Sequence, residues 1–268
     1  MSNVPLVSIC CLTYNHEPYI RQCLEGFLMQ KTNFAVEILI HDDASTDKTE
    51  SILREYKARY PEKIFPLYET ENKYSNGYAN VIDIAFNYSR AQGKYIAYCE
   101  GDDYWTDPLK LQKQVDFMES HPEYSICFHR CQHLNTNTGE LSDDNCADLF
   151  SQDMEGIDIT ADMSLSSWIT QPLTMLFRRS CFCAEWEKHY KHYRDMHEIY
   201  HLLMAGKGYL FSFVGGVYRY HTGGIHSMIS SEQYCTTSLP IDEEFYRVNR
   251  TPAAKLNYIY TLRDCINY

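Results

Sequence analysis

The chain has 268 residues, with 24 lysines and arginines, 36 aspartates and glutamates, and a formal net charge of −12 at pH 7. This length is sufficient for one large α/β domain with its own core, and a hydrophobic content of 44% excludes a disordered chain. The acidic balance argues against non-specific binding to nucleic acid, so we expect no nucleic acid partner.

The first hundred residues alternate apolar runs with amphipathic patterns, which predicts an α/β fold with a mostly parallel sheet flanked by helices. The predicted strands cover residues 7–12, 36–40, 64–68 and 95–99. The predicted helices cover residues 19–28, 47–60 and 79–89, and a fourth begins at Asp107-Pro108. Asp47 and Glu50 have the spacing of a capping box for the second helix. Pro66 has no N–H to donate, which predicts that the third strand lies at a sheet edge.

The pattern weakens in the second half of the chain. Residues 135–166 are rich in Asp, Asn, Ser and Thr and predict a long surface excursion. Apolar structure resumes at residues 168–177, followed by predicted helices within 182–205, a predicted strand at 209–214 and the segment 217–221. We expect Gly223-Gly224 to be mobile and the tail from Ser231 to form a C-terminal helical extension.

The cysteines and the N-terminal residues bear on the compartment. No apolar run approaches the roughly 18–20 residues of a membrane span, and Met1 to Pro5 do not resemble a signal peptide. Eleven cysteines are an odd number, many lie in apolar runs, and no Cys-x-x-Cys occurs. We therefore expect free, buried thiols in a reducing compartment. This predicts a cytoplasmic protein, and local basic patches would allow it to associate peripherally with the inner face of the membrane.

Polar clusters follow three of the predicted strands, where ligands bind in open parallel sheets. The clusters are Thr13-Tyr14-Asn15, Asp42-Asp43 and Glu100-Gly101-Asp102-Asp103. The chain has no Gly-x-Gly-x-x-Gly and no phosphate-loop lysine motif, so a glycine-rich cradle is not its way of binding phosphate. Adjacent carboxylates suit a hard cation, Mg²⁺ or Mn²⁺, which can bridge them to the phosphates of a substrate.

Three segments of the chain resemble the family-two glycosyltransferases of GT-A fold in spacing and order. They are Val7-Ser8-Ile9 with Thr13-Tyr14-Asn15, Asp42 to Asp47, and Gly93 to Asp103. The resemblance covers residues 4–130 and extends to about 230 through Tyr218-Arg219-Tyr220-His221. It implies a Rossmann-like fold with a nucleotide-sugar half at 1–135, an acceptor half at 136–230 and a helical tail at 231–268.

The resemblance also implies an activity. These enzymes transfer a sugar from a nucleotide-sugar donor, here a UDP-sugar, to a hydroxyl with inversion. The implied partners are that donor and a glycan or lipid-linked saccharide acceptor in bacterial surface polysaccharide synthesis. A catalytically inactive domain that only binds sugar nucleotides is an alternative.

The resemblance assigns the donor site residue by residue. Thr13, Tyr14 and Asn15 would line the nucleotide pocket, Asp43 would bond the base with Asp42 beside it, Asp102 would approach the ribose or sugar, and Asp103 would hold the metal. Glu17 and Asn72 stand where the family has polar donor-site groups, although residues 71–77 depart from its shorter pattern. The alternatives are turn formation and helix capping for the acids, core packing for Tyr14 and a solvated loop for Asn72.

The second half supplies the remaining candidates. Asp195 in Arg194-Asp195-Met196-His197 resembles the family's general base, with an ordinary helix cap as the alternative. His221 would contact the metal or the diphosphate, and a surface histidine is equally compatible. Trp168 could stack on an acceptor sugar or pack in the core.

Two histidine motifs indicate a different chemistry. His197-Glu198-Ile199-Tyr200-His201 matches the His-Glu-x-x-His signature of zinc proteases, but the next turn, Leu202-Leu203-Met204, offers no third ligand. With eleven histidines in the chain, we expect this match to be accidental. In the predicted strand at 127–133, alternation sends His129, Cys131 and His133 to one face without a fourth ligand, so we expect a partly buried strand.

Overall fold

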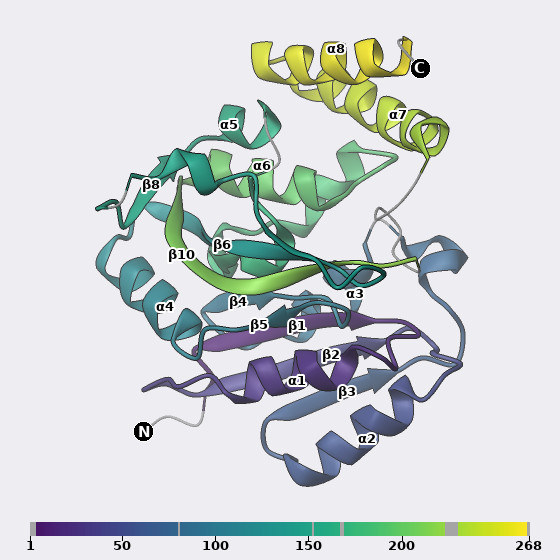
Figure 1. The fold of residues 1–268 in the computed structure, drawn as a ribbon, viewed down its shortest axis with the longest axis vertical. Coiled ribbons are helices and arrows are strands. Elements are labelled where there is room, and N and C mark those ends of the chain that lie inside the picture. Colours follow the sequence, from purple (N-terminus) through teal and green to yellow (C-terminus); the bar gives the residue numbers. More distant parts are fainter. Residues whose placement is uncertain (1–3, 80, 152, 167–168, 223–229, 267–268) are drawn as a thin grey trace.

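The computed structural model describes residues 4–79, 81–151, 153–166, 169–222 and 230–266. Within these residues, ten strands form one curved sheet with the order β3-β2-β1-β4-β9-β6-β10-β5, with β7 on β6 and β8 on β10. Helices cover both faces of the sheet, and the helices α7 and α8 lie together at one end of the molecule (Figure 1). Trp168 and Gly223-Gly224 lie outside the described residues.

The first half of the chain has the predicted alternation of strands and helices. Its strands are β1 (Val7–Thr13), β2 (Val36–Asp42), β3 (Ile64–Tyr68) and β4 (Tyr95–Tyr98). Its helices are α1 (Ile20–Leu28), α2 (Thr49–Arg59) and α3 (Ile82–Phe86), with a 3₁₀ turn at Tyr88–Arg90. The four strands pair in parallel, and β3 occupies the edge, as Pro66 predicts.

The second half completes the sheet with shorter and mixed pairings. Its strands are β5 (Tyr104–Trp105), β6 (Tyr124–Asn135), β7 (Leu141–Asp143), β8 (Gly156–Ile159), β9 (Leu176–Arg178) and β10 (Lys207–Tyr220). Its helices are α4 (Lys110–Ser120), α5 (Ala161–Ser166), α6 (Asp195–Ala205), α7 (Ser231–Asn249) and α8 (Pro252–Ile266), with a 3₁₀ segment at Ala184–His189. The predicted strand at 209–214 and residues 217–220 of the following segment belong to one strand, β10, which pairs with β6 in parallel through register shifts.

The predicted surface excursion at 135–166 contains regular structure. The strand β8 pairs antiparallel with β10, and β7 pairs antiparallel with β6. These strands have three or four residues each. These short strands form by pairing with the long strands β10 and β6. Because strand formation depends on such partners, the local sequence pattern is weak.

Alternation along β1 shows how the core forms on both sides of the sheet. Val7, Ile9 and Cys11 pack with α1, α2 and α4 in one buried cluster. Cys10, on the opposite face, belongs to a second buried cluster that includes residues of α5, α6 and α7. Because successive side chains of a strand point to opposite faces, one strand contributes to both clusters.

The capping box predicted for α2 is wrong. Lys48 occupies the cap position, and the Asp47 carboxylate accepts hydrogen bonds from the N–H of Thr49 and of Glu17, both at 2.9 Å. The Glu50 carboxylate instead pairs with Arg54, one turn along the helix. Asp47 therefore connects the start of α2 to the loop after β1.

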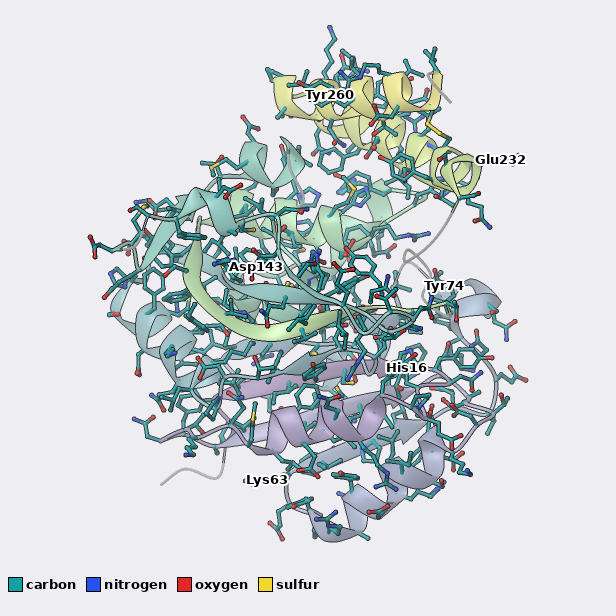
Figure 2. The ribbon with its side chains drawn as sticks, viewed as in Figure 1. His16, Lys63, Tyr74, Asp143, Glu232 and Tyr260 are labelled. Atoms are coloured by element: carbon teal, nitrogen blue, oxygen red, sulfur yellow. A yellow bond between two sulfur atoms is a disulfide. The ribbon has the colours of Figure 1, made fainter. Side chains whose placement is uncertain are left out.

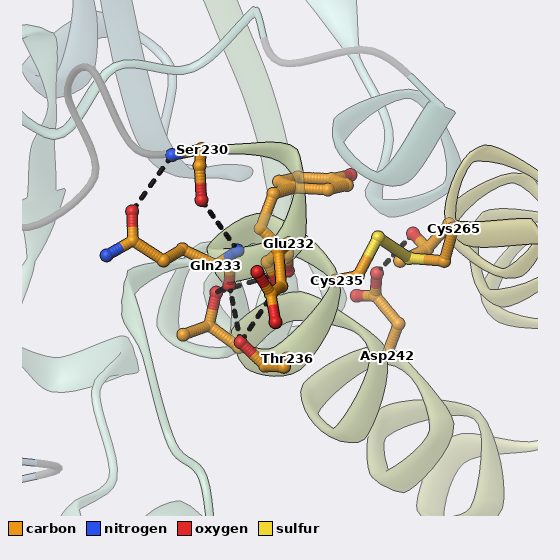
Figure 3. The surroundings of a disulfide bond; sticks show 10 residues. Ser230, Glu232, Gln233, Cys235, Thr236, Asp242 and Cys265 are labelled. Carbon is orange, nitrogen blue, oxygen red and sulfur yellow. Dashed lines mark hydrogen bonds between the residues drawn. A yellow bond between two sulfur atoms is a disulfide. The ribbon is translucent and has the colours of Figure 1, made fainter. Parts of the chain in front are cut away.

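The expectation that all cysteines are free is also wrong. Cys235 in α7 forms a disulfide with Cys265 in α8, and Figure 3 shows the bond between the two helices. The two helices run antiparallel in a hairpin, so residues 30 positions apart come together. Seven of the nine free cysteines are buried, as expected for small apolar side chains. Each helix in the described residues is too short or too polar to span a bilayer.

Candidate functional site

The strand-end clusters meet at one edge of the sheet. Thr13 at the end of β1 is in register with Asp42 at the end of β2, and the N–H of Gly101 bonds to the carbonyl of Leu12. Figure 2 shows His16 and Tyr74, from the loops that follow β1 and β3, on this same side of the molecule. The sheet order changes direction at β1, between β2 and β4, which is where a crevice for a ligand is expected.

Three carboxylates gather in the acidic run after β4. One oxygen from each of Glu100, Asp102 and Asp103 lies within 4.8 Å of the others. Asp103 is 2% exposed, and its Oδ1 accepts a hydrogen bond from the N–H of Arg219 at 2.8 Å. The Arg219 guanidinium in turn donates to the carbonyl of Asp102 and to Gln22 in α1. The strand β10 thus holds the acidic run from the second half of the chain.

The three carboxylates have different pKa values because their partners differ. Burial raises the pKa of Glu100 and of Asp103, and the negative charge of Asp102 raises both further. Burial would also raise the pKa of Asp102, but the hydrogen bond with His221 and the charge of His16 lower it below its ordinary value. Asp102 is therefore the carboxylate that stays ionised most readily, beside two that resist ionisation without a cation.

This donor set fits a hard divalent cation. All three groups offer oxygen, the ligand atom that Mg²⁺ and Mn²⁺ prefer. Asp102 Oδ1 is buried and has no hydrogen-bond partner among the described residues, although a buried carboxylate oxygen normally has one. A cation would satisfy this oxygen and offset the repulsion between the three groups.

The two histidines beside Asp102 belong to its immediate surroundings. His221 Nε2 lies 2.9 Å from Asp102 Oδ2, and His16 Nε2 lies 3.7 Å from the same oxygen. The rings of His221 and Tyr19 are 4.8 Å apart. His221 is therefore a hydrogen-bond partner of a carboxylate in this group, and direct contact between His221 and a metal stays a prediction.

Asn15 and Glu17 join the loop after β1 to the loop after β2. Asn15 has a left-handed backbone with φ of 55°, a conformation that asparagine tolerates. Its Oδ1 accepts hydrogen bonds from the N–H of Thr46 at 2.7 Å and from the N–H of Asp47 at 3.4 Å. Glu17 accepts from the N–H and the Nζ of Lys48. Both side chains connect the two loops at this edge of the sheet.

Asp43 and Asn72 fix a third loop. The two carboxylate oxygens of Asp43 accept from the N–H of Lys73 at 2.6 Å and the N–H of Tyr74 at 3.0 Å. The side-chain amide of Asn72 donates to the Asp43 carbonyl. A base-edge contact by Asp43 would use the remaining lone pairs of its carboxylate, and it stays a prediction.

The other nucleotide candidates differ in exposure. Asp42 is buried, burial raises its pKa, and its Oδ1 accepts from the Ser45 hydroxyl at 2.5 Å. Thr13 is buried against Gly101, where a Cβ would lie 2.7 Å from the threonine Oγ1. Tyr14 is 43% exposed, which rules out a core role for its side chain. Of these three, Tyr14 is the one that presents its side chain to solvent at the sheet edge.

Asp195 is the first residue of α6, and its side chain is exposed. Arg194 is the cap residue, so Asp195 lies in the first turn of the helix. Burial raises the pKa of Glu198 to about 8, and the negative charge of Asp195 contributes to this rise. The same charge is one of the smaller causes that raise the pKa of Glu100, after burial. The charge of Asp195 thus acts on the acidic run of the first half, and its role as the general base stays a prediction.

The histidines of the zinc-protease motif have other partners. His197 is fully buried, its Nδ1 accepts from the N–H of Arg194, and burial lowers its pKa to about 3. Glu198 accepts from the Tyr88 hydroxyl, and His201 Nε2 lies 2.9 Å from the Tyr190 hydroxyl. In the part of the chain that the structure describes, no group of three metal ligands includes these residues. The motif is a packed helix face.

The other histidine motif forms the expected strand. His129, Cys131 and His133 alternate along β6 and are all buried, without forming a group of metal ligands within the described residues. Arg219, Gln22 and His16 are site residues that the sequence analysis missed. Arg219 had a detectable signal, because alternation in Tyr218-Arg219-Tyr220-His221 sends Arg219 and His221 to the same face.

Comparison with known proteins identifies the family. The model of the family described as "Glycosyl transferase family 2" matches residues 8–182, more than half of the chain. The chain belongs to glycosyl transferase family 2. Its acidic run, strand order and flanking helices are therefore those of a glycosyltransferase of GT-A fold.

Two relatives illustrate the range of similarity within the family. The chain is 51% identical over 123 residues to the Mycobacterium tuberculosis protein Rv1520, covering 46% of this chain and 34% of that protein. It is 36% identical over 115 residues to the Escherichia coli UDP-Glc:alpha-D-GlcNAc-diphosphoundecaprenol beta-1,3-glucosyltransferase WfaP, covering 43% of this chain and 42% of that one. The chain thus matches less than half the length of these relatives.

Solved structures agree in fold at low sequence identity. Staphylococcus aureus TarS 1–349 in complex with UDP-GlcNAc has a TM-score of 0.66 at 17% identity, covering 98% of this chain and 73% of that one. The mannosyltransferase PcManGT from Pyrobaculum calidifontis, in complex with GDP-Man and Mn²⁺, has a TM-score of 0.64 at 16% identity, covering 98% and 74%. The likeness extends over nearly the whole chain, including most of residues 183–268, which the family model leaves unmatched.

Proposed function

We propose that this glycosyltransferase moves a sugar from a UDP-sugar to a hydroxyl of a lipid-linked saccharide or growing glycan of the bacterial surface, with inversion. The observation that carries the proposal is the group of three carboxylates, Glu100, Asp102 and Asp103, at the carboxyl edge of the sheet. Two similar proteins support the substrate classes. TarS was solved with UDP-GlcNAc, and WfaP is named as a UDP-Glc enzyme that acts on a diphosphoundecaprenol-linked sugar.

The donor would bind along the edge formed by β1, β2 and β4. Asp103, with Asp102 and Glu100, would hold Mg²⁺ or Mn²⁺, which supplies a Lewis acid for the charge on the departing nucleoside diphosphate. Thr13 and Tyr14 would line the nucleotide, and Asp43 would contact the base. Asn15, Glu17 and Asn72 would act by keeping the surrounding loops in place.

Asp195 would act as the general base. In a single displacement, the acceptor oxygen forms a bond to the anomeric carbon while the bond from that carbon to the diphosphate oxygen breaks. The proton of the acceptor hydroxyl passes to the Asp195 carboxylate, and one displacement inverts the anomeric centre. An exposed carboxylate in the first turn of α6, whose charge acts on Glu100, is suited to meet an acceptor that enters from solvent.

A thermal-shift screen of nucleotide sugars with and without Mn²⁺ tests the donor assignment. We expect one UDP-sugar to raise the melting temperature in the presence of Mn²⁺ and to lose most of this effect with a chelator. A larger shift with a GDP- or dTDP-sugar would overturn the UDP assignment.

Transfer is tested with the donor found in that screen and a diphosphoundecaprenol-linked saccharide. NMR of the anomeric proton of the product should show inverted configuration. Retained configuration would exclude the single displacement. Donor binding without transfer to any lipid-linked or free glycan tested would favour an inactive, sugar-nucleotide-binding domain.

A further inference from the structure

The C-terminal helix hairpin, α7 and α8, has a buried polar contact between its helices and exposed apolar side chains on α8. Between its helices, the Asp242 carboxylate accepts hydrogen bonds from the Asn257 amide at 2.9 Å and from the Thr261 hydroxyl at 2.6 Å. Asp242 and Thr261 are buried. The outer face of α8 is instead apolar. A helix that turns polar residues inward and apolar residues outward is built to face an apolar environment.

The exposed apolar residues of α8 form a stripe along one side of the helix, which Arg263 interrupts. Leu256, Ile259, Tyr260 and Ile266 follow helical spacing and are 43%, 43%, 40% and 74% exposed. Together with Tyr234 and Val248 of α7, they make six of the fifteen large apolar side chains exposed in the described residues. The hairpin covers only residues 231–266, so exposed apolar side chains are strongly concentrated there.

The charges of the hairpin differ from those of the rest of the chain. Its four basic residues, Arg247, Arg250, Lys255 and Arg263, are all exposed. Of its five acidic residues, Asp242 and Glu244 are buried, which leaves Glu232, Glu243 and Asp264 at the surface. Residues 1–230 carry 20 basic and 31 acidic side chains. The exposed surface of the hairpin therefore has four basic and three acidic side chains, whereas acidic side chains are in clear excess over residues 1–230.

Basic residues accompany the apolar stripe itself. Arg263 lies one turn from both Ile259 and Ile266, and Lys255 flanks Leu256. Both have long alkyl stems, which can pack beside apolar groups while the charge reaches the lipid headgroups. Tyrosine also favours the interface between headgroups and acyl chains. Apolar anchors, a tyrosine and flanking basic residues on one face are the features of a helix that lies in a membrane surface.

We propose that the outer face of α8 docks this glycosyltransferase on an anionic lipid membrane. The disulfide between Cys235 and Cys265 joins the first part of α7 to the last turn of α8 and fixes the presented face (Figure 3). This inference rests on the proposed function, in which the acceptor is lipid-linked. Docking would hold the active site close to acceptors in the membrane. Ten residue steps separate His221 from Ser231, so the start of α7 lies within about 35 Å of the site.

A second copy of the chain is the competing occupant. In a two-fold contact the stripe would pack against itself, which would bring the basic residues Lys255 and Arg263 of both copies to one interface. The exposed charge of the hairpin favours an anionic lipid surface over this arrangement. Light scattering of the purified protein separates the two occupants.

Sedimentation with vesicles tests the proposal on the full chain. We expect binding to vesicles of phosphatidylglycerol and phosphatidylcholine. The double variant Leu256→Gln/Ile259→Gln should weaken the partition coefficient at least about tenfold, because it removes two apolar anchors. Lys255→Gln/Arg263→Gln should weaken it about 25-fold, at about fivefold per charge, and should have little effect on pure phosphatidylcholine vesicles.

The matched controls are Leu149→Gln, a leucine with 41% exposure outside the hairpin, and Lys63→Gln, and neither should change binding. All variants lie on the surface and should keep the wild-type melting temperature. Equal binding of wild type and both double variants would overturn the proposal, as would a dimer that Leu256→Gln/Ile259→Gln converts to a monomer. Donor stabilisation by Mn²⁺ and UDP-sugar does not depend on this face, so failure of docking and failure of the proposed function are distinguishable.

Discussion

The carboxylate of Asp103 accepts a hydrogen bond from the backbone N–H of Arg219 at 2.8 Å, across 116 positions of sequence. The bond joins the acidic run after β4 to the end of β10. It is reinforced by the Arg219 guanidinium, which donates to the carbonyl of Asp102 and to Gln22. The geometry of the acidic group therefore depends on the second half of the chain as much as on the first.

Asp103→Asn removes the negative charge of Asp103 and keeps an oxygen that can accept this hydrogen bond. The amide oxygen can still accept from Arg219, but the side chain no longer offers a negative ligand to a cation. We expect Mn²⁺-dependent donor binding to fall by at least about 100-fold while the melting temperature stays within a few degrees of wild type. Titration calorimetry with donor and Mn²⁺ measures the loss. Asp116→Asn, on the exposed face of α4, is the control. Wild-type activity of Asp103→Asn in a chelator would remove the metal assignment.

Asp195→Asn should remove the proton acceptor and leave the donor site intact. We expect kcat to fall by about 100- to 10,000-fold with an unchanged KM for the donor. Initial-rate kinetics at several donor concentrations separate the two constants. Glu232→Gln is a matched control, since Glu232 is another exposed acid in the first turn of a helix. If Asp195→Asn retains full turnover, another group must take the proton.

Asn15 can be tested with two substitutions that differ in backbone freedom. Asn15→Ala loses the Oδ1 acceptor and places alanine at a φ of 55°, which costs about 1 kcal/mol for the conformation and about 0.5–1.5 kcal/mol for the hydrogen bonds. Asn15→Gly loses the acceptor but adopts this φ without strain. Urea unfolding should therefore rank wild type above glycine and glycine above alanine. Equal free energies of unfolding for the Asn15→Gly and Asn15→Ala variants would show that residue 15 does not retain the left-handed conformation.

The stability of the protein should depend on pH through Lys110. Lys110 is fully buried against Trp105, with Nζ 3.8 Å from the ring centroid, and burial lowers its pKa to about 7. Between pH 7 and about 10.5 the unfolded chain binds this proton more tightly than the folded one, so this residue destabilises the fold increasingly as pH falls through that range and fully below it.

Lys110→Met removes this penalty and also the contact of the cation with Trp105. The stability of the variant relative to wild type should be most favourable near pH 7 and should decrease as pH rises toward 10. Denaturant unfolding of both proteins at several pH values gives this difference, and Lys63→Met, on the surface, should show none. A difference that does not vary with pH would contradict the lowered pKa.

The hairpin disulfide should contribute to stability by restricting the unfolded chain. Cys235→Ser removes the cross-link between two residues that are 30 positions apart. We expect the free energy of unfolding to fall by about 2–4 kcal/mol. A reducing agent should lower the wild-type melting temperature to that of the variant. Cys183→Ser, at an exposed free cysteine, should have no such effect. Identical melting of wild type with and without reductant would indicate that the two thiols are not joined.

Local patterns predicted the parts of the fold that depend on neighbouring residues. The strands β1, β2 and β4 and the polar residues that follow them were readable because each strand is a buried apolar run that ends in a polar cluster. The site edge follows from parallel pairing alone. The contacts of Asn15 and Asp43 were not readable, because their partners lie about 30 positions away on loops whose paths depend on the whole sheet.

Long-range arrangement accounts for the remaining differences. The disulfide requires the antiparallel packing of α7 on α8, which no cysteine spacing indicates. The capping box failed because Glu50 finds Arg54 on its own helix and Asp47 serves two loops instead. The single strand β10 was read as two segments because its register shifts interrupt the alternation of its side chains.

The position of β10 has a consequence for enzyme engineering. Its last residues, with His221, touch the acidic run, while its first residues pair with β8 of the second half. A chimaera of two relatives joined at the end of β6 would bring a foreign strand into contact with the acidic run. A junction chosen to preserve donor chemistry would have to keep the end of β10 and the acidic run from the same parent enzyme.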